Sequence, residues 1–87
     1  MINYQNNKPF VEGVSIEDIA SSHTTPMYVY SQKKIEEKYN KLKNTLNAEI
    51  FYAVKANSNQ AIIKLMSTVG AGADVVSVGE LERAITA

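Results

Sequence analysis

Cysteine is absent from the 87-residue sequence, and neither sign of charge is in excess. Without cysteine, this stretch can form no disulfide framework, no thiolate metal site and no cysteine nucleophile. Lysine plus arginine and aspartate plus glutamate each number 9, so the formal net charge is zero. Because nucleic-acid binding needs a basic patch, we predict no nucleic-acid partner.

Long hydrophobic runs are absent as well. No window approaches the roughly 18 consecutive apolar residues of a membrane helix. The N-terminal stretch MINYQNNKPF lacks the basic and apolar regions of a secretory signal. These features favour a cytoplasmic protein without a membrane partner. The single histidine, His23, lies among helix-breaking residues with no acid or second histidine at ligand spacing, so we interpret it as a loop residue and expect no metal site.

The first thirty residues predict a segment with one short helix. The stretch 1–14 is polar and rich in asparagine, and we expect it to be irregular or weakly extended. Ser15-Ile16-Glu17-Asp18 has the pattern of a capping box and predicts a helix start. Breaker residues over 21–26 end that helix. Met27-Tyr28-Val29-Tyr30 contains β-type residues and predicts a short strand.

A longer amphipathic helix is predicted to begin after Ser31, which can cap it. Apolar side chains then recur at steps of four, three and four, and lysines and glutamates occupy the other side. The apolar positions are Ile35, Tyr39, Leu42 and Leu46. Asn47 is suited to end the helix.

The remaining residues predict the order strand, helix, strand, helix. Ile50–Val54 is a continuous apolar run, typical of a strand buried on both faces of a parallel sheet. Ala73–Ser77 predicts the second strand, and Gly70-Ala71-Gly72 ends the helix between the two strands. The helices are indicated by capping candidates at Asn57, Ser58 and Asn59, by apolar positions Ile62, Leu65, Met66 and Val69, and by a second capping box at Ser77 and Glu80. The fold class is therefore α/β, with a βαβ unit and parallel strands.

The last predicted helix has no stop signal before Ala87, and two parallel strands cannot cover both faces of a sheet. We therefore expect a fragment of a larger protein. The alternative is a small protein that ends on a frayed helix.

Lys55 directly follows the first predicted parallel strand. Ligands and catalytic groups collect at the carboxyl ends of such strands. A lysine there can bond covalently to a carbonyl compound or to pyridoxal phosphate. From position alone, a solvated charge at a strand end is the alternative.

The residues around Lys55 resemble a known motif. Phe51-Tyr52-Ala53-Val54-Lys55-Ala56-Asn57 is similar to the cofactor-lysine motif of the fold-type III pyridoxal-phosphate decarboxylases. The resemblance extends upstream to Thr25-Pro26-Met27-Tyr28-Val29-Tyr30 and downstream through Gly70–Ser77 and Gly79-Glu80-Leu81, and it covers roughly Gly13 to Ala87. Three motifs in the right order are specific, whereas any one alone is weak.

Within this fold type, the sequence is most similar to the diaminopimelate decarboxylases. Alanine racemases usually continue the lysine motif with Ala-Tyr-Gly-His, whereas Ser58-Asn59-Gln60 follows here. Ornithine decarboxylases typically have cysteine where Ala56 stands. Arginine and carboxynorspermidine decarboxylases stay open as alternatives. Val78 stands where the family more often has glycine, and we expect it to start the last helix normally.

The resemblance implies both an architecture and a site. Residues 31–87 would be the start of a pyridoxal-phosphate-binding (β/α)8 TIM barrel, and residues 1–30 would contribute to a companion β-domain. Lys55 would hold pyridoxal 5′-phosphate, and Asp74 would be a catalytic acid near that lysine. Ala53 would be a small residue beside the cofactor ring. The alternatives are a strand aspartate bonded to backbone for Asp74 and simple barrel packing for Ala53.

The resemblance also implies a reaction. The substrate would be an amino acid, meso-2,6-diaminopimelate, converted to L-lysine and carbon dioxide, and the full-length protein would be a homodimer. In the family, the phosphate-binding glycine loop, the histidine that stacks on the cofactor ring and the acid that pairs with the pyridinium nitrogen all come later in the chain. We therefore expect these 87 residues alone to be inactive. A non-catalytic, truncated remnant is the alternative from a different functional class.

Overall fold

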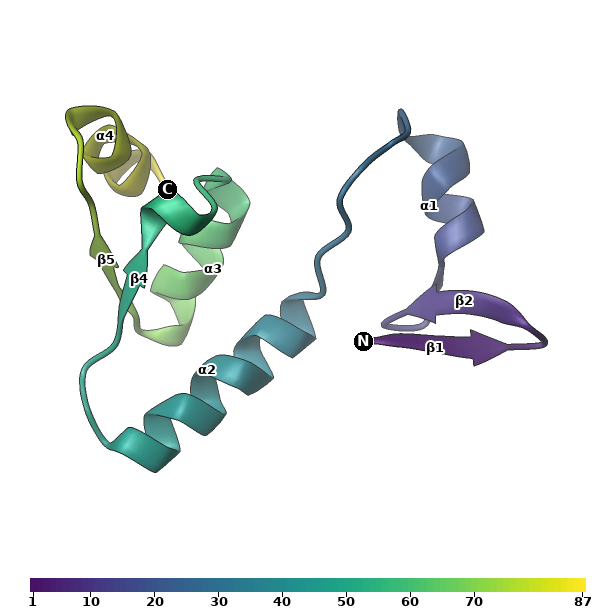
Figure 1. Ribbon diagram of the computed structural model, residues 1–87, viewed down its shortest axis with the longest axis horizontal. Helices are drawn as coiled ribbons and strands as arrows, with labels where there is room; N and C mark the ends of the chain where they lie inside the picture. The colour runs from purple at the N-terminus through teal and green to yellow at the C-terminus, as the bar shows by residue number, and fades with distance from the viewer. The chain divides into compact units, whose positions relative to one another are not determined.

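The computed structural model describes residues 1–87, which divide into two compact units, Met1–Glu37 and Lys38–Ala87. Figure 1 shows the order of the elements along the chain. These elements are β1 (Ile2–Gln5), β2 (Lys8–Val11), β3 (Val14–Ser15), α1 (Ile16–Ser22), α2 (Gln32–Leu46), β4 (Phe51–Ala53), the 3-10 helix η1 (Val54–Ala56), α3 (Gln60–Val69), β5 (Gly72–Asp74) and α4 (Val78–Thr86).

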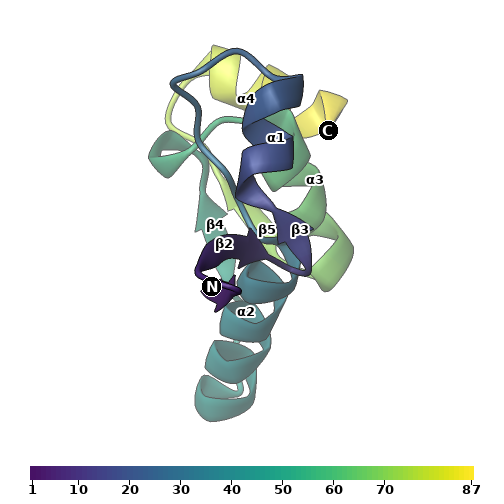
Figure 2. The same cartoon turned by 90° about the vertical axis from the view of Figure 1, so that its right-hand side faces the viewer.

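The first unit contains a three-stranded antiparallel sheet in the order β1-β2-β3, in which the short β3 is labelled in Figure 2. The turn between β1 and β2 is made by Asn6 and Asn7, whose φ angles are 53° and 63°. Asparagine tolerates this left-handed conformation, and two such residues in succession suit a tight hairpin turn. Of the two alternatives predicted for 1–14, the extended one is therefore confirmed and the irregular one is wrong.

The short helix α1, predicted from the capping-box pattern at Ser15, is confirmed. The Ser15 hydroxyl accepts a hydrogen bond from the Asp18 amide at 3.4 Å, and the helix ends at Ser22. The predicted strand over Met27–Tyr30 is wrong, because this segment pairs with no other strand. The rings of Tyr28 and Tyr30 are exposed and stack on each other, with centroids 6.4 Å apart.

The ends of α2 also agree with the sequence. The hydroxyl of Ser31, which is buried, accepts a hydrogen bond from the Lys34 amide at 3.1 Å and donates one to a Glu12 carboxylate oxygen at 2.9 Å. Asn47 follows the helix with a φ of 47°, and its amide donates to the Lys43 carbonyl at 2.9 Å. A capping hydroxyl thus begins the helix, and a left-handed asparagine ends it.

The apolar side of α2 is covered only in part. Tyr39 is buried and Ile35 is half-buried, whereas Leu42 and Leu46 are exposed. The predicted periodicity therefore identified the helix correctly but overestimated the burial of its last turns.

The second unit contains the predicted parallel βαβ arrangement. Strands β4 and β5 pair in parallel, with Phe51 opposite Gly72 and Ala53 opposite Asp74. The Asn59 side chain caps α3 by accepting from the Ala61 amide at 2.9 Å. The prediction of a helical crossover between two parallel strands is confirmed.

The boundaries of the second unit differ slightly from the predicted ones. Strand β4 ends at Ala53, because Val54 already belongs to the 3-10 helix. Strand β5 covers Gly72–Asp74, whereas the sequence predicted 73–77. Helix α4 begins normally at Val78, and the Ser77 hydroxyl caps it by accepting from the Glu80 amide at 3.1 Å.

Only one face of the β4–β5 pair is covered by helices within this unit. Tyr52 and Ala73 point to that face, where they line a cavity of about 190 Å3 together with side chains of α3 and α4. The opposite face is open, and the Phe51 side chain on it is 60% exposed. The prediction that this strand is buried on both faces is therefore wrong. None of the helices combines the length and the apolar character that a membrane crossing needs.

Candidate functional site

Lys55 occupies the middle of the 3-10 helix η1, directly after β4. The preceding Val54 is fully buried, with 0% exposure, and its carbonyl accepts a hydrogen bond from the Asn57 amide at 3.1 Å. The buried valine and this bond hold the backbone of the turn. The Lys55 side chain itself is exposed, and its amine makes no hydrogen bond and no ion pair. The site thus presents a free primary amine on a fixed backbone.

Asp74 is the last residue of β5 and lies opposite Ala53 in the parallel pair. Residues that pair in this way project to the same face of a sheet, so Ala53 and Asp74 share a face. The Asp74 side chain is exposed and makes no hydrogen bond to backbone or to any other group. It forms no ion pair with Lys55. The structure therefore brings the three predicted residues to the carboxyl end of one strand pair, with the acid and the amine not bonded to each other.

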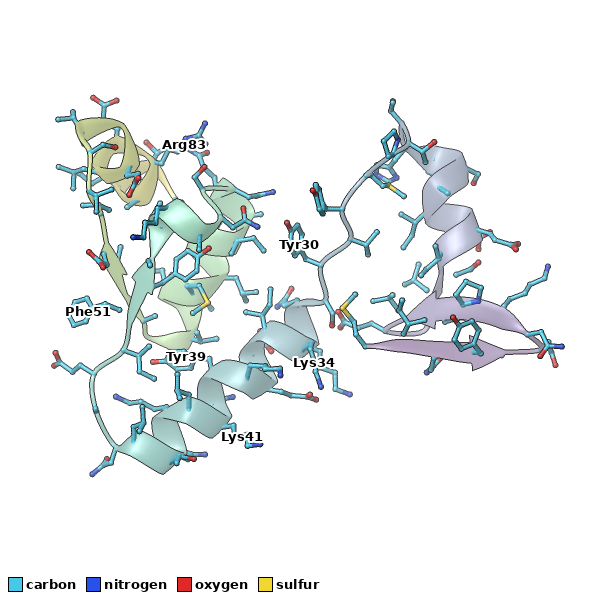
Figure 3. All side chains as sticks on the ribbon, viewed as in Figure 1. Tyr30, Lys34, Tyr39, Lys41, Phe51 and Arg83 are labelled. Carbon is cyan, nitrogen blue, oxygen red and sulfur yellow. The ribbon has the colours of Figure 1, made fainter.

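Beneath Ala53 and Asp74, the same open face carries Phe51 and Gly72. A β-carbon added to Gly72 would lie 2.4 Å from Cδ1 of the Phe51 ring. The ring thus lies across the neighbouring strand at the one position where no side chain stands in its way. Figure 3 shows Phe51 projecting from β4 on the side away from α3.

Two further residues hold the segment that follows Lys55. The Tyr52 hydroxyl donates a hydrogen bond to the Asn57 carbonyl at 2.7 Å, and this contact is partly buried. Nη1 of Arg83, on α4, donates to the Ser58 carbonyl at 3.3 Å. Sequence reasoning did not identify either role. Tyr52 stood inside the quoted motif without an assigned function, and no local signal connects Arg83 to a residue 25 positions earlier.

The single histidine belongs to the first unit, whereas the site residues described above belong to the second. His23 follows α1 as its C-cap, and its Nδ1 lies 3.0 Å from the Ile19 carbonyl oxygen. No group of three or more histidine and carboxylate side chains is placed to hold a metal ion.

The chemistry of these residues fits a cofactor that carries an aldehyde. A primary amine in its unprotonated form can attack an aldehyde carbonyl, and a carboxylate within reach can exchange protons with the product of that attack. Ala53 carries only a methyl group at the strand end, which is the smallest side chain after glycine's. An amine, an acid and a small side chain are the residue types that fit the roles which the pyridoxal-phosphate resemblance implies for Lys55, Asp74 and Ala53.

Residues 32–87 match the family described as "Pyridoxal-dependent decarboxylase, pyridoxal binding domain". The chain is 44% identical over 81 residues to the diaminopimelate decarboxylase of Aquifex aeolicus, an alignment that covers 92% of this chain and 19% of that protein. It is 42% identical over 88 residues to the diaminopimelate decarboxylase of Pseudomonas fluorescens, covering 98% and 21%. The chain thus spans about a fifth of the length of these curated relatives.

A solved structure is similar to the whole chain. The crystal structure of diaminopimelate decarboxylase from M. jannaschii superposes with a TM-score of 0.83 at 35% identity, covering 98% of this chain and 22% of that one. A second structure of the same protein, in co-complex with L-lysine, also superposes with a TM-score of 0.83.

Proposed function

The chain belongs to the pyridoxal-dependent decarboxylase family, within its pyridoxal binding domain, and on that premise we propose that it forms part of an enzyme that converts meso-2,6-diaminopimelate to L-lysine and carbon dioxide. The observation that carries the proposal is the free amine of Lys55 at the carboxyl end of a parallel strand pair, beside Ala53 and Asp74. The curated relatives are diaminopimelate decarboxylases, and the L-lysine bound to the M. jannaschii protein supports the proposed product.

In this proposal, Lys55 binds pyridoxal 5′-phosphate through its amine. When bound, this cofactor withdraws the electrons that remain when the substrate loses its carboxylate. Asp74 holds or moves a proton beside the Lys55 amine, at the shared strand end. Ala53 leaves room for the ring, because a larger side chain at this position would project to the same face as Asp74.

The wider architecture is part of the same proposal. The parallel pair β4–β5 with its helices would be the first units of a (β/α)8 barrel, a fold in which catalytic residues lie at the carboxyl ends of the strands. Residues 1–30 would contribute to a companion β-domain, a role that their antiparallel sheet supports. The full-length protein would act as a homodimer, as the family resemblance implies.

The first test is borohydride reduction of the natural protein with pyridoxal 5′-phosphate, followed by intact-mass measurement and peptide mapping. We expect a pyridoxyl group on Lys55 and its loss in Lys55→Arg, which keeps the charge. The matched control is Lys64→Arg, because Lys64 is an exposed lysine of α3 in the same unit. A label on other lysines alone, or no label, would contradict the cofactor role.

The second test separates the substrates. Carbon dioxide release is measured with meso-2,6-diaminopimelate, arginine, ornithine and carboxynorspermidine. We expect turnover with diaminopimelate alone. Turnover with arginine or the polyamine precursor would instead support a different decarboxylase of the same fold. No turnover by a full-length protein that is labelled at Lys55 would support a non-catalytic remnant.

A further inference from the structure

The segment after Lys55 is tied to its surroundings more firmly than an exposed loop requires. The Asn57 amide donates to the Val54 carbonyl at 3.1 Å, and the Asn57 side-chain oxygen accepts from the Asn59 amide at 3.1 Å. A third polar group of Asn57, its backbone carbonyl, accepts the 2.7 Å hydrogen bond from the Tyr52 hydroxyl. Asn57 is therefore held through its amide, its side chain and its carbonyl.

The Tyr52 bond closes a ring of chain around the reactive lysine. Tyr52 lies in β4 before Lys55, and Asn57 lies after it, so the hydroxyl bridges the start and the end of the turn. The Tyr52 ring points to the helix-covered face of the sheet, where it lines the cavity with Ile63 and Met66. The donor of this bond is thus held by the strand that contains Tyr52 and by the packing of its ring. The bond therefore limits how far the turn can move.

Arg83 adds a second tie from a different element. Its guanidinium reaches from α4 to the Ser58 carbonyl, the next carbonyl along the chain, at 3.3 Å (Figure 3). Because this contact is exposed, we expect it to be weaker than the partly buried Tyr52 bond. The two donors reach consecutive carbonyls, one from the strand before the turn and one from the helix that follows β5.

We propose that Tyr52 and Arg83 are positioning residues that clamp the turn after Lys55 and so fix the direction in which the Lys55 amine approaches the cofactor. This inference rests on the proposed cofactor role of Lys55. Precise placement of a reacting group contributes strongly to catalysis, and it depends on neighbours that hold its backbone. Neither residue touches the reacting atoms in this proposal, since both act through the carbonyls of Asn57 and Ser58.

The test compares substitutions that remove only the donors. Tyr52→Phe deletes the hydroxyl and keeps the ring, and Arg83→Gln shortens the donor at an exposed position where the fold tolerates change. Tyr39→Phe is the matched control for the tyrosine, because buried Tyr39 lies against Gly70 at the opposite end of the strands. Lys43→Gln is the control for the arginine, because Lys43 also donates to a backbone carbonyl, that of Ala48, at 2.7 Å.

Hydrogen exchange of the cofactor-free protein tests the clamp without any chemistry at Lys55. We expect amides over 54–59 to exchange roughly five- to tenfold faster in Tyr52→Phe, as the loss of one hydrogen bond predicts. Arg83→Gln should accelerate them by about two- to fivefold, because its bond is exposed. Arg83→Lys, which keeps a cationic donor, should restore part of the protection. Unchanged exchange over 54–59 in both Tyr52→Phe and Arg83→Gln would overturn the clamp.

Reconstitution with pyridoxal 5′-phosphate tests what the clamp does. We expect Tyr52→Phe to bind the cofactor roughly five- to tenfold more weakly and to give a smaller circular-dichroism signal per bound cofactor. Both controls should match the unsubstituted protein. A Tyr52→Phe protein that is labelled at Lys55, with the affinity and signal of the Tyr39→Phe control, would overturn the positioning role. Faster exchange combined with no label at Lys55 in any variant would instead reject the proposed cofactor function, and the positioning role would fall with it.

Discussion

Replacing Gly72 by alanine tests whether the Phe51 ring truly lies across the strand pair. The added β-carbon would sit 2.4 Å from one ring carbon and 2.5 Å from the next, so the ring must move. Overpacking of this kind costs about 1–3 kcal/mol. The cost should fall near the lower end, because the ring is 60% exposed and can rotate into solvent. Alanine also has fewer conformations than glycine in the unfolded state, and this difference stabilises the folded state by about 0.4–1 kcal/mol. We expect Gly72→Ala to lower the free energy of unfolding by about 1 kcal/mol.

The reasoning is sharper in a double-mutant cycle. In a Phe51→Ala background the ring is gone, so Gly72→Ala should raise the free energy of unfolding by about 0.5 kcal/mol through the chain-entropy effect alone. The coupling energy between the two positions is then about 1.5 kcal/mol, within the range observed for residues in contact. Urea unfolding of the natural protein and the three variants measures it, from midpoints and slopes fitted together.

Gly79→Ala is the matched control for this cycle. A β-carbon at Gly79 would meet only the Ser77 hydroxyl oxygen, at the ordinary distance of 3.9 Å. Gly79 lies in the first turn of α4, where alanine is the better helix former. We expect this control to be stabilising by up to about 0.5–1 kcal/mol, with no coupling to Phe51. A coupling energy near zero between positions 51 and 72 would refute the assigned ring position.

Three further predictions concern substitutions of single residues. Ser77→Ala removes the hydroxyl that caps α4 and should lower the free energy of unfolding by about 1 kcal/mol in urea titrations, whereas Ser77→Thr should keep most of it. Gly70→Ala places a side chain at a φ of 104°, where L-residues are strained, and should cost about 1–2 kcal/mol in the same assay. Asp74→Asn should lower decarboxylation by about 100-fold, the low end of typical general acid–base contributions, with an unchanged unfolding midpoint, since its side chain makes no bond in the structure. Full activity of Asp74→Asn would remove the acid from the proposed mechanism.

Signals confined to a few neighbouring residues predicted most of the helices. Ser15, Ser31 and Ser77 cap the three helices that the sequence assigned to them, because a capping hydroxyl and its target amide lie within three residues of each other. Gly70 ends α3 in the left-handed conformation for an equally local reason. The parallel βαβ arrangement followed from the order of these elements, since a helical crossover joins parallel strands.

Features that depend on distant partners were not predictable in the same way. Met27–Tyr30 has the composition of a strand, but a strand forms only where another strand supplies backbone partners, and none does. The polar stretch 1–14 contains a β-hairpin that was not predicted, and its local signal was the Asn6-Asn7 pair at the turn. The apolar run Ile50–Val54, which contains β4, suggested a strand with two buried faces. Helices cover only the face that carries Tyr52.

The candidate site also combines residues that local sequence signals predict with residues that they do not. The place of Lys55 was predictable because the lysine directly follows a strand, where ligands collect in parallel sheets. Asp74 was selected only through the family resemblance, because the sequence predicted a strand over 73–77, whereas β5 ends at Asp74. The ties from Tyr52 and Arg83 were not predictable, because they depend on which carbonyls the folded turn presents.

The early end of β4 determines the backbone conformation at Lys55. Had the strand continued through Val54 as predicted, the Lys55 amide and carbonyl would lie in line with the ladder to β5. Instead the chain turns at Val54, whose side chain is fully buried and whose carbonyl bonds to the Asn57 amide. The backbone of Lys55 is thereby held between buried Val54 before it and Asn57 after it, whose carbonyl accepts the Tyr52 hydrogen bond. The Lys55 side chain remains exposed. A lysine at a solvated strand end would need neither the buried valine nor the bonded carbonyls, so these contacts favour a lysine whose position matters.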